Sequence, residues 1–107
     1  MNAIIIGPDN GLEAAFEQQG FDIRRIDLGT ADALREAGIA EATIVVLTDV
    51  GEATAVPIAK DENPDVRVVI YSEETMPEFV RGQVDLSVAP DVLSPTIFVE
   101  ELANGQG

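Results

Sequence analysis

Four carboxylates stand in turn-like segments directly after short apolar runs of this sequence. They are Asp9, Asp27, Asp49 and Glu52. If these turns meet in the folded chain, the four acids gather near one crevice, where their like charges repel unless a cation or an arginine neutralises them. The alternative is that each acid caps a helix or solvates a loop.

Two side chains on which much enzyme chemistry depends are absent. The chain contains no cysteine and no histidine, which excludes disulfides, thiolate metal sites, thiol nucleophiles and the usual general base near neutral pH. We therefore predict no catalytic residue and no metal ligand. The remaining chemistry favours a protein that is not an enzyme.

Acidity dominates the composition. Twenty acidic residues face six basic ones, and the formal net charge is −14. Molar salt shortens the Debye length to about 3 Å and screens the resulting self-repulsion, so the balance is typical of a halophilic, archaeal cytoplasm. We interpret the acids as a solvated surface rather than an acidic binding patch. Nucleic acids and anionic membranes are not expected as partners, because the pair Arg24 and Arg25 is too small a basic surface.

Apolar runs alternate with segments of helical periodicity along the whole chain. The predicted strands are residues 3–6, 21–26, 43–47, 66–71 and 85–88. The predicted helices are residues 11–19, 30–37, 52–61 and 77–82, and a last one that opens at Ser94-Pro95 and turns Ile97, Phe98 and Leu102 inward. Pro57 should kink the third helix or delay its regular part.

This alternation predicts a three-layer α/β/α domain of Rossmann-like or flavodoxin-like type. The five strands form a parallel sheet of order 2-1-3-4-5. We assign residues 1–103 to one domain and residues 104–107 to a flexible tail. No stretch reaches the roughly 20 apolar residues that a membrane span needs, and we expect a soluble, cytoplasmic protein.

Ligands of such sheets bind beyond the carboxyl ends of the strands where the winding direction reverses. That point lies between the first and third strands, so the predicted rim is formed by the loop from Gly7 to Gly11, the loop that begins at Asp27, and the loop from Thr48 to Gly51.

Two long segments resemble a known family. They are IIIGPDNGLEAAFEQQGFDIRRID and LREAGIAEATIVVLTDVGEATAVPIAKDENPDVRVVIYS, and they are similar to the TrkA-N or RCK domain, the Rossmann-type nucleotide-binding module of potassium-transport regulators. The resemblance implies that the first glycines let the backbone approach a phosphate at a helix amino terminus, and that Asp27 holds a ribose hydroxyl. The implied ligand is an adenine nucleotide, and the implied binding residues are Gly7, Asp9, Gly11, Asp27, Thr48 and Asp49.

The dinucleotide fingerprint G-x-G-x-x-G is nevertheless incomplete. Asp9 and Leu12 stand where its second and third glycines belong, and residues 27–30 are too few for the helix and strand that follow in that family. Tight dinucleotide binding is therefore not expected. A nucleotide would bind through Gly11, Asp27 and Thr48.

The strand order also looks like that of response-regulator receiver domains. In that reading Asp49 is the phosphate acceptor, Asp9 part of a magnesium site and Ser72 the hydroxyl residue. The lysine of the family is missing, since Ala89 and Pro90 lie near its place. A degenerate receiver-like module that acts through protein contacts is therefore the alternative to a non-catalytic regulatory or nucleotide-sensing module.

The chain further resembles small haloarchaeal proteins of unassigned function that are sometimes labelled CTP synthetase. That activity needs a phosphate-binding lysine loop and a cysteine-histidine amidotransferase site, which the sequence lacks. An enzyme or enzyme subunit is the third hypothesis. As a partner we expect a second copy or a regulatory protein, with segment 86–98 as the contact surface. The alternative is that these residues complete the core.

Overall fold

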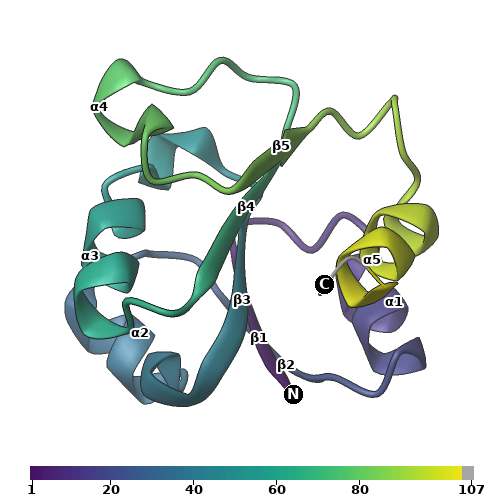
Figure 1. Cartoon of the computed structure of the whole chain (residues 1–107), viewed down its shortest axis with the longest axis horizontal. Helices are drawn as coiled ribbons and strands as arrows, with labels where there is room; N and C mark the ends of the chain where they lie inside the picture. Colours follow the sequence, from purple (N-terminus) through teal and green to yellow (C-terminus); the bar gives the residue numbers. More distant parts are fainter. Residues whose placement is uncertain (105–107) are drawn as a thin grey trace.

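Five short segments form one parallel sheet in the computed structural model, which describes residues 1–104 (Figure 1). The strands are β1 (Asn2–Ile6), β2 (Asp22–Ile26), β3 (Ala42–Leu47), β4 (Arg67–Tyr71) and β5 (Leu86–Val88). Their order is β2-β1-β3-β4-β5 and every pairing is parallel. The predicted fold class and strand order are confirmed.

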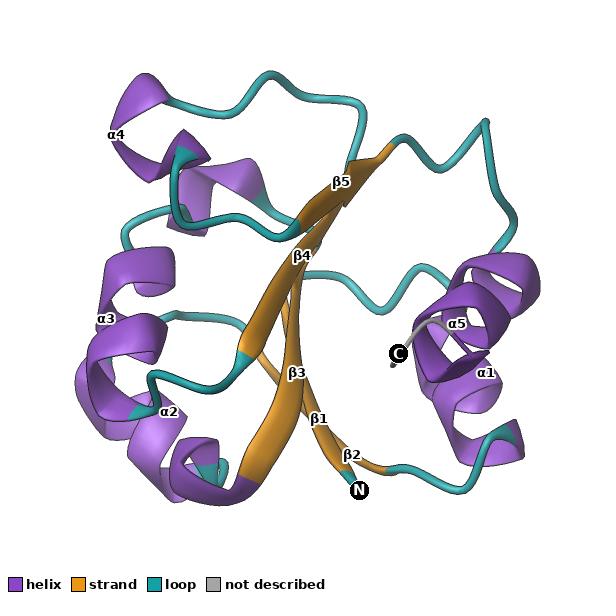
Figure 2. Cartoon of the chain, viewed as in Figure 1, coloured by secondary structure: helices purple, strands orange, loops and turns teal. Residues whose placement is uncertain are grey.

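Helices cover both faces of the sheet (Figure 2). The helices are α1 (Leu12–Gln18), α2 (Ala31–Glu36), α3 (Ala55–Glu62), α4 (Glu78–Arg81) and α5 (Pro95–Asn104), with single 3-10 turns η1 (Ile39–Glu41) and η2 (Val50–Glu52). Helices α1 and α5 lie on one face, and α2, α3 and α4 lie on the other. The three layers follow from right-handed crossovers between parallel strands.

The central strands are apolar without alternation because both of their faces are buried. In β1, Ile4 and Ile6 join the cluster under α2 and α3, whereas Ala3 and Ile5 join the cluster under α1 and α5. The edge strand β2 differs, since its residues are exposed or half-buried. Polarity in a strand therefore marks the edge of this sheet.

Three local predictions need correction or refinement. Ile97 does not point inward, because its side chain is 43% exposed, and Val99 takes the buried place beside Phe98. The third helix begins late: η2 is followed by a regular α3 that carries Pro57 in its first turn, where no intrahelical donor is lost. Helix α5 extends through Asn104, so only the part of the predicted tail at residues 105–107 lies outside the described residues.

None of the helices in residues 1–104 combines the length and the apolar character that crossing a membrane requires.

Candidate functional site

The carboxyl ends of the first three strands lie side by side. Ile6 at the end of β1 is in register with Ile26 of β2 and with Leu47 of β3. Two hydrogen bonds continue this pairing into the loops, from Gly7 N–H to the Ile26 carbonyl at 2.9 Å and from Thr48 N–H to the Ile6 carbonyl at 3.0 Å. The three loops nominated from the sequence therefore start at one rim of the sheet.

Gly7 and Thr48 are in direct contact at this rim. The buried Thr48 hydroxyl donates to the Pro8 carbonyl at 2.7 Å and lies 3.2 Å from the Ile6 carbonyl. A β-carbon on Gly7 would lie 2.5 Å from Thr48 Oγ1. The backbone of Gly7 has a φ of 114°, which residues other than glycine rarely adopt. Glycine here serves the close approach of the β1 and β3 loops.

The amino terminus of α1 is occupied by a side chain of its own loop. Asp9 accepts hydrogen bonds from Gly11 N–H at 2.9 Å and from Glu13 N–H at 2.8 Å. These backbone donors are the groups that a helix start would offer to a phosphate. Pro95 of α5 lies against Gly11, with its Cγ 3.1 Å from where a β-carbon would be.

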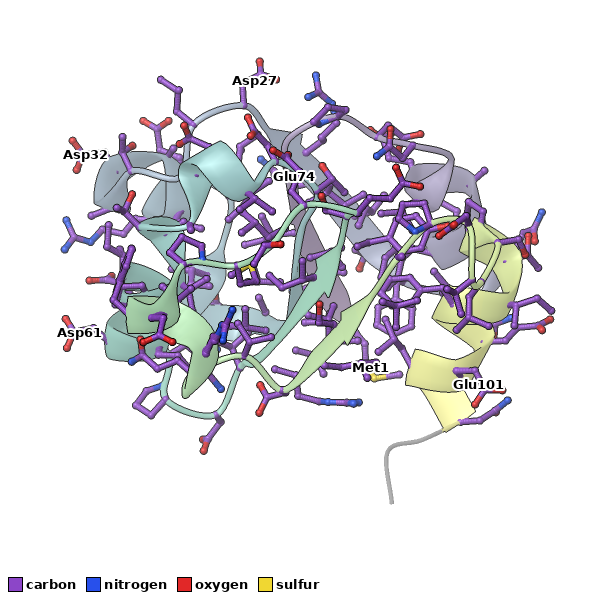
Figure 3. All side chains as sticks on the ribbon, turned by 90° about the horizontal axis from the view of Figure 1, so that it is seen from above. Met1, Asp27, Asp32, Asp61, Glu74 and Glu101 are labelled. Carbon is purple, nitrogen blue, oxygen red and sulfur yellow. The ribbon has the colours of Figure 1, made fainter. Side chains whose placement is uncertain are left out.

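Arg25 is the cation of the rim, and it was not nominated from the sequence. Its guanidinium pairs with Asp27 at 2.6 Å, donates to the Gly7 carbonyl at 3.0 Å and lies 3.9 Å from Glu13. The hydrogen bond and the charge of Asp27 raise the pKa of Arg25 above its ordinary value. A signal for this contact was present, because side chains two residues apart share one face of a strand. Asp27 itself projects at the periphery of the molecule (Figure 3).

The two remaining acids of the predicted crevice also bind backbone N–H groups. Asp49 accepts from Gly51 N–H at 2.9 Å, and Glu52 accepts from Gly29 N–H at 2.8 Å. Within residues 1–104, no three acidic side chains are arranged to hold a metal ion. All four carboxylates thus have capping, turn or ion-pair partners within the chain.

Asp49 and Ser72, which the receiver-like hypothesis would bring into one site, each accept a hydrogen bond within a separate turn. Ser72 Oγ accepts from Glu74 N–H at 3.1 Å. Lys60 lies away from both, because it donates to the Val66 carbonyl at 2.8 Å and pairs with Asp85 at 3.0 Å.

A family of proteins matches almost the whole sequence. A model for a family of unknown function, DUF7126, matches residues 3–102. The chain belongs to DUF7126. No curated protein matches it.

A solved structure shares the fold of this DUF7126 chain. It is described as a pilus assembly-related protein of Burkholderia pseudomallei, and it superposes with a TM-score of 0.66 over 97% of this chain and 87% of the other. The sequences are 14% identical. At that identity the likeness concerns the fold alone.

Three hollows in the surface of the DUF7126 chain lie at the edges of its sheet. Two of them, of about 550 and 190 Å³, flank β2 and share Arg24, Glu36 and Ala37 in their linings. The third, of about 510 Å³, lies beside β5 and is lined in part by Met76 and Val84. None of the three is lined by the six residues nominated as binding residues.

Four exposed large apolar residues of this DUF7126 chain belong to β5 and to the segments that precede and follow it in the sequence, with Phe79 on the α4 face of the sheet and Ile97 on the α5 face. Leu86, Val92 and Ile97 fall in the segment predicted to make contacts, whereas Phe98 at its end is fully buried in the core. Phe79 on α4, 61% exposed, was missed. Its helix is only four residues long, too short for periodicity to separate an inward from an outward side chain.

Proposed function

We propose that this chain is a non-catalytic regulatory module that binds another protein along the edge of its sheet at β5. The observation that carries the proposal is the distribution of exposed large apolar side chains in residues 1–104. Four of the six belong to α4, β5, α5 and the loop before α5. We call these four the β5 border: Phe79, Leu86, Val92 and Ile97.

The edge strand beside these residues adds a second argument. Strand β5 is three residues long and pairs with β4 alone, and an edge strand offers unpaired backbone groups to another chain. Single exposed apolar residues are ordinary on soluble proteins, whereas a group of them marks an interaction surface. Aromatic and methionine side chains are enriched in such interfaces, and Phe79 and the hollow beside Met76 fit that chemistry.

The rim at the carboxyl ends of β1 and β3 is less suited to a ligand, because its polar groups already have partners within the chain. The backbone donors at the start of α1 bind Asp9, and the Gly7 turn packs on Thr48. A small anionic ligand there has to displace contacts that the chain already makes. The four side chains of the β5 border are apolar and exposed, and a protein partner would cover them without displacing a hydrogen bond that they make.

The proposal agrees with the degenerate receiver-like module among the sequence hypotheses. It includes no phosphoryl transfer at Asp49, because the receiver lysine has no counterpart near Ala89 and Pro90.

Adenine-nucleotide binding is a second candidate, and one observation favours it. Gly7, Thr48 and Asp49 are in contact at the point where the winding of the sheet reverses, which is where nucleotides bind in open α/β sheets. In this candidate Gly11 and Asp27 complete the contacts to the phosphate and ribose groups.

The first experiment tests the β5 border. Phe79→Ser/Val92→Ser removes two side chains that are 61% and 70% exposed, so circular dichroism should show an unchanged fold. Leu28→Ser, at a residue 59% exposed in the β2–α2 loop, is the matched control.

Each of these proteins is used as bait in a salt-matched extract of its source, and the captured protein is purified and titrated calorimetrically. We expect binding by wild type and Leu28→Ser, and at least about tenfold weaker binding by the double variant, since buried apolar anchors dominate interfaces. Equal affinities would contradict the proposal.

A thermal-shift panel with ATP, ADP, AMP, NAD and NADH tests the second candidate. A nucleotide at 100 times its dissociation constant should stabilise the fold by about 2.7 kcal/mol, and Asp27→Ala should remove the shift. Absence of a thermal shift with every nucleotide would contradict the nucleotide site, and it would not bear on protein binding at the β5 border.

We place the module in the cytoplasm of a salt-rich, archaeal cell. The proposal is supported by 20 acidic against six basic residues. It is also supported by the only lysine, Lys60, which contacts Val66 and Asp85 in the loops before β4 and β5 instead of standing on the open surface.

A further inference from the structure

The second edge of the sheet carries charges without partners. Strand β2 pairs with β1 alone and lies at the opposite end of the sheet from β5 (Figure 2). Asp22 and Arg24 of this strand are exposed, and neither side chain forms an ion pair or a hydrogen bond among the interactions of residues 1–104. Arg25 differs, because it is held by Asp27 and the Gly7 carbonyl. The edge offers unpaired backbone groups to another strand, and opposite charges that lie directly across from each other stabilise an antiparallel strand pair.

The sequence of this edge is nearly symmetric in charge. It reads Asp22-Ile23-Arg24-Arg25-Ile26-Asp27. A twofold axis normal to the sheet would pair two copies of β2 antiparallel. The axis then passes between the two copies of one residue, called here the residue on the axis, and the other residues face partners on the same face of the sheet. The charges can therefore be compared for each residue that could sit on the axis.

Only one register makes new attractive pairs. With Asp22, Arg24 or Arg25 on the axis, a charge faces its own copy. With Ile26 on the axis, Arg25 faces the partner's Asp27, but these side chains are already paired within each chain. With Ile23 on the axis, Asp22 faces the partner's Arg24 twice over, and the two Ile23 side chains meet.

The surroundings of β2 leave room for a second copy. The hollow of about 550 Å³ is lined by residues of β2 and by Glu17 of α1 and Glu36 of α2, and the hollow of about 190 Å³ lies between β2 and α2. Glu36, which lines both hollows together with Arg24, adds a further acid near the guanidinium. No described segment of the chain pairs with the outer side of β2.

We propose that two copies of this chain associate through antiparallel pairing of their β2 strands about Ile23. The product is a continuous ten-stranded sheet in which Asp22 and Arg24 find their partners in the other copy. Both β5 borders stay free at the far ends of this sheet. The dimer would therefore present two copies of the partner surface, although its formation does not depend on that proposed function.

The test is the dimer dissociation constant, measured by sedimentation at a potassium chloride concentration at which circular dichroism shows a folded chain. Arg24→Asp places acids opposite each other and should weaken association by at least about tenfold, because attraction at two cross-strand positions becomes repulsion. The swapped variant Asp22→Arg/Arg24→Asp restores both pairs and should recover the wild-type constant. Arg81→Asp makes the same charge change on α4 and should leave association unchanged.

A cross-link reports the register. The chain has no cysteine, so Ile23→Cys introduces a single thiol next to the axis, and mild oxidation should link two copies. Leu28→Cys is the control that should remain unlinked. The proposal is overturned by a monomeric wild type, by a swapped variant as weak as Arg24→Asp, or by absence of the Ile23→Cys link. It is also overturned if Phe79→Ser/Val92→Ser abolishes the dimer, which would place the contact at β5.

Discussion

Lys60, the only lysine of the chain, links α3 to the residues directly before β4 and β5 through one ammonium group. Its Nζ donates to the Val66 carbonyl at 2.8 Å and pairs with Asp85 at 3.0 Å, and Asp85 also accepts from Val68 N–H at 2.8 Å. Burial raises the pKa of the Asp85 carboxyl, but the hydrogen bond from Val68 and the pairing with Lys60 outweigh it. The pKa of Asp85 therefore lies below its ordinary value of 3.8.

The lowered pKa of Asp85 means that its ionised form stabilises the folded chain. Because the folded pKa is depressed, ionised Asp85 stabilises the fold above its unfolded pKa, and the contribution is lost as the pH falls through the folded pKa. Asp85→Asn should lower the free energy of unfolding at neutral pH by about 1 kcal/mol, the low end for a charged hydrogen bond because the carboxylate is 42% exposed. The gap between wild type and variant should close below about pH 4.

Urea titrations at fixed salt and several pH values measure that gap. Asp61→Asn, at an exposed acid on the periphery (Figure 3), should follow the wild-type curve. A constant difference between wild type and Asp85→Asn across the acid range would contradict the assignment.

At the scale of elements, the loop after β2 is held against α3 by a close contact. A β-carbon on Gly29 would lie 2.3 Å from the β-carbon of Ala55, while Gly29 N–H donates to Glu52 at 2.8 Å. Movement of the loop away from α3 would strain that hydrogen bond. We expect Gly29→Ala to destabilise the fold by about 1–3 kcal/mol through overpacking.

The matched control is Gly82→Ala. Gly82 has a helical backbone with φ of −72°, and a β-carbon there meets no atom within 4 Å. Its substitution should change the free energy of unfolding by less than about 0.5 kcal/mol, as usual for a surface position. Equal denaturation midpoints for the Gly29→Ala and Gly82→Ala variants would contradict the prediction, because the β2–α2 loop would then accommodate the added methyl group without loss of stability.

The elements themselves were predictable for a local reason. Uninterrupted apolar runs such as Ile44-Val45-Val46-Leu47 identify strands buried on both faces, and caps such as Thr30, whose hydroxyl accepts from Ala33 N–H, identify helix starts. The error at Ile97 arose because periodicity predicts an apolar helix face but not how much of that face the neighbouring elements cover.

At the scale of the whole molecule, a net charge of −14 on 107 residues opposes compaction. We expect the thermal midpoint to rise with potassium chloride, and the fold to loosen below a few hundred millimolar, because the Debye length shrinks from about 10 Å at 0.1 M to about 3 Å at 1 M. Replacing three exposed acids, Asp61→Asn, Glu74→Gln and Glu101→Gln, should reduce the salt dependence (Figure 3). A midpoint that does not respond to salt would contradict a halophilic origin.

The sequence alone determined the fold class, the strand order and the rim at which three loops begin, because hydrophobic periodicity and short connections are local properties. Only the tertiary structure decided what the rim residues do. Thr48 binds the carbonyl of Pro8, 40 residues away, and Arg25 reaches the carbonyl of Gly7. Contacts between residues so distant in the chain leave no periodic trace, since they depend on which side chains the completed sheet brings together.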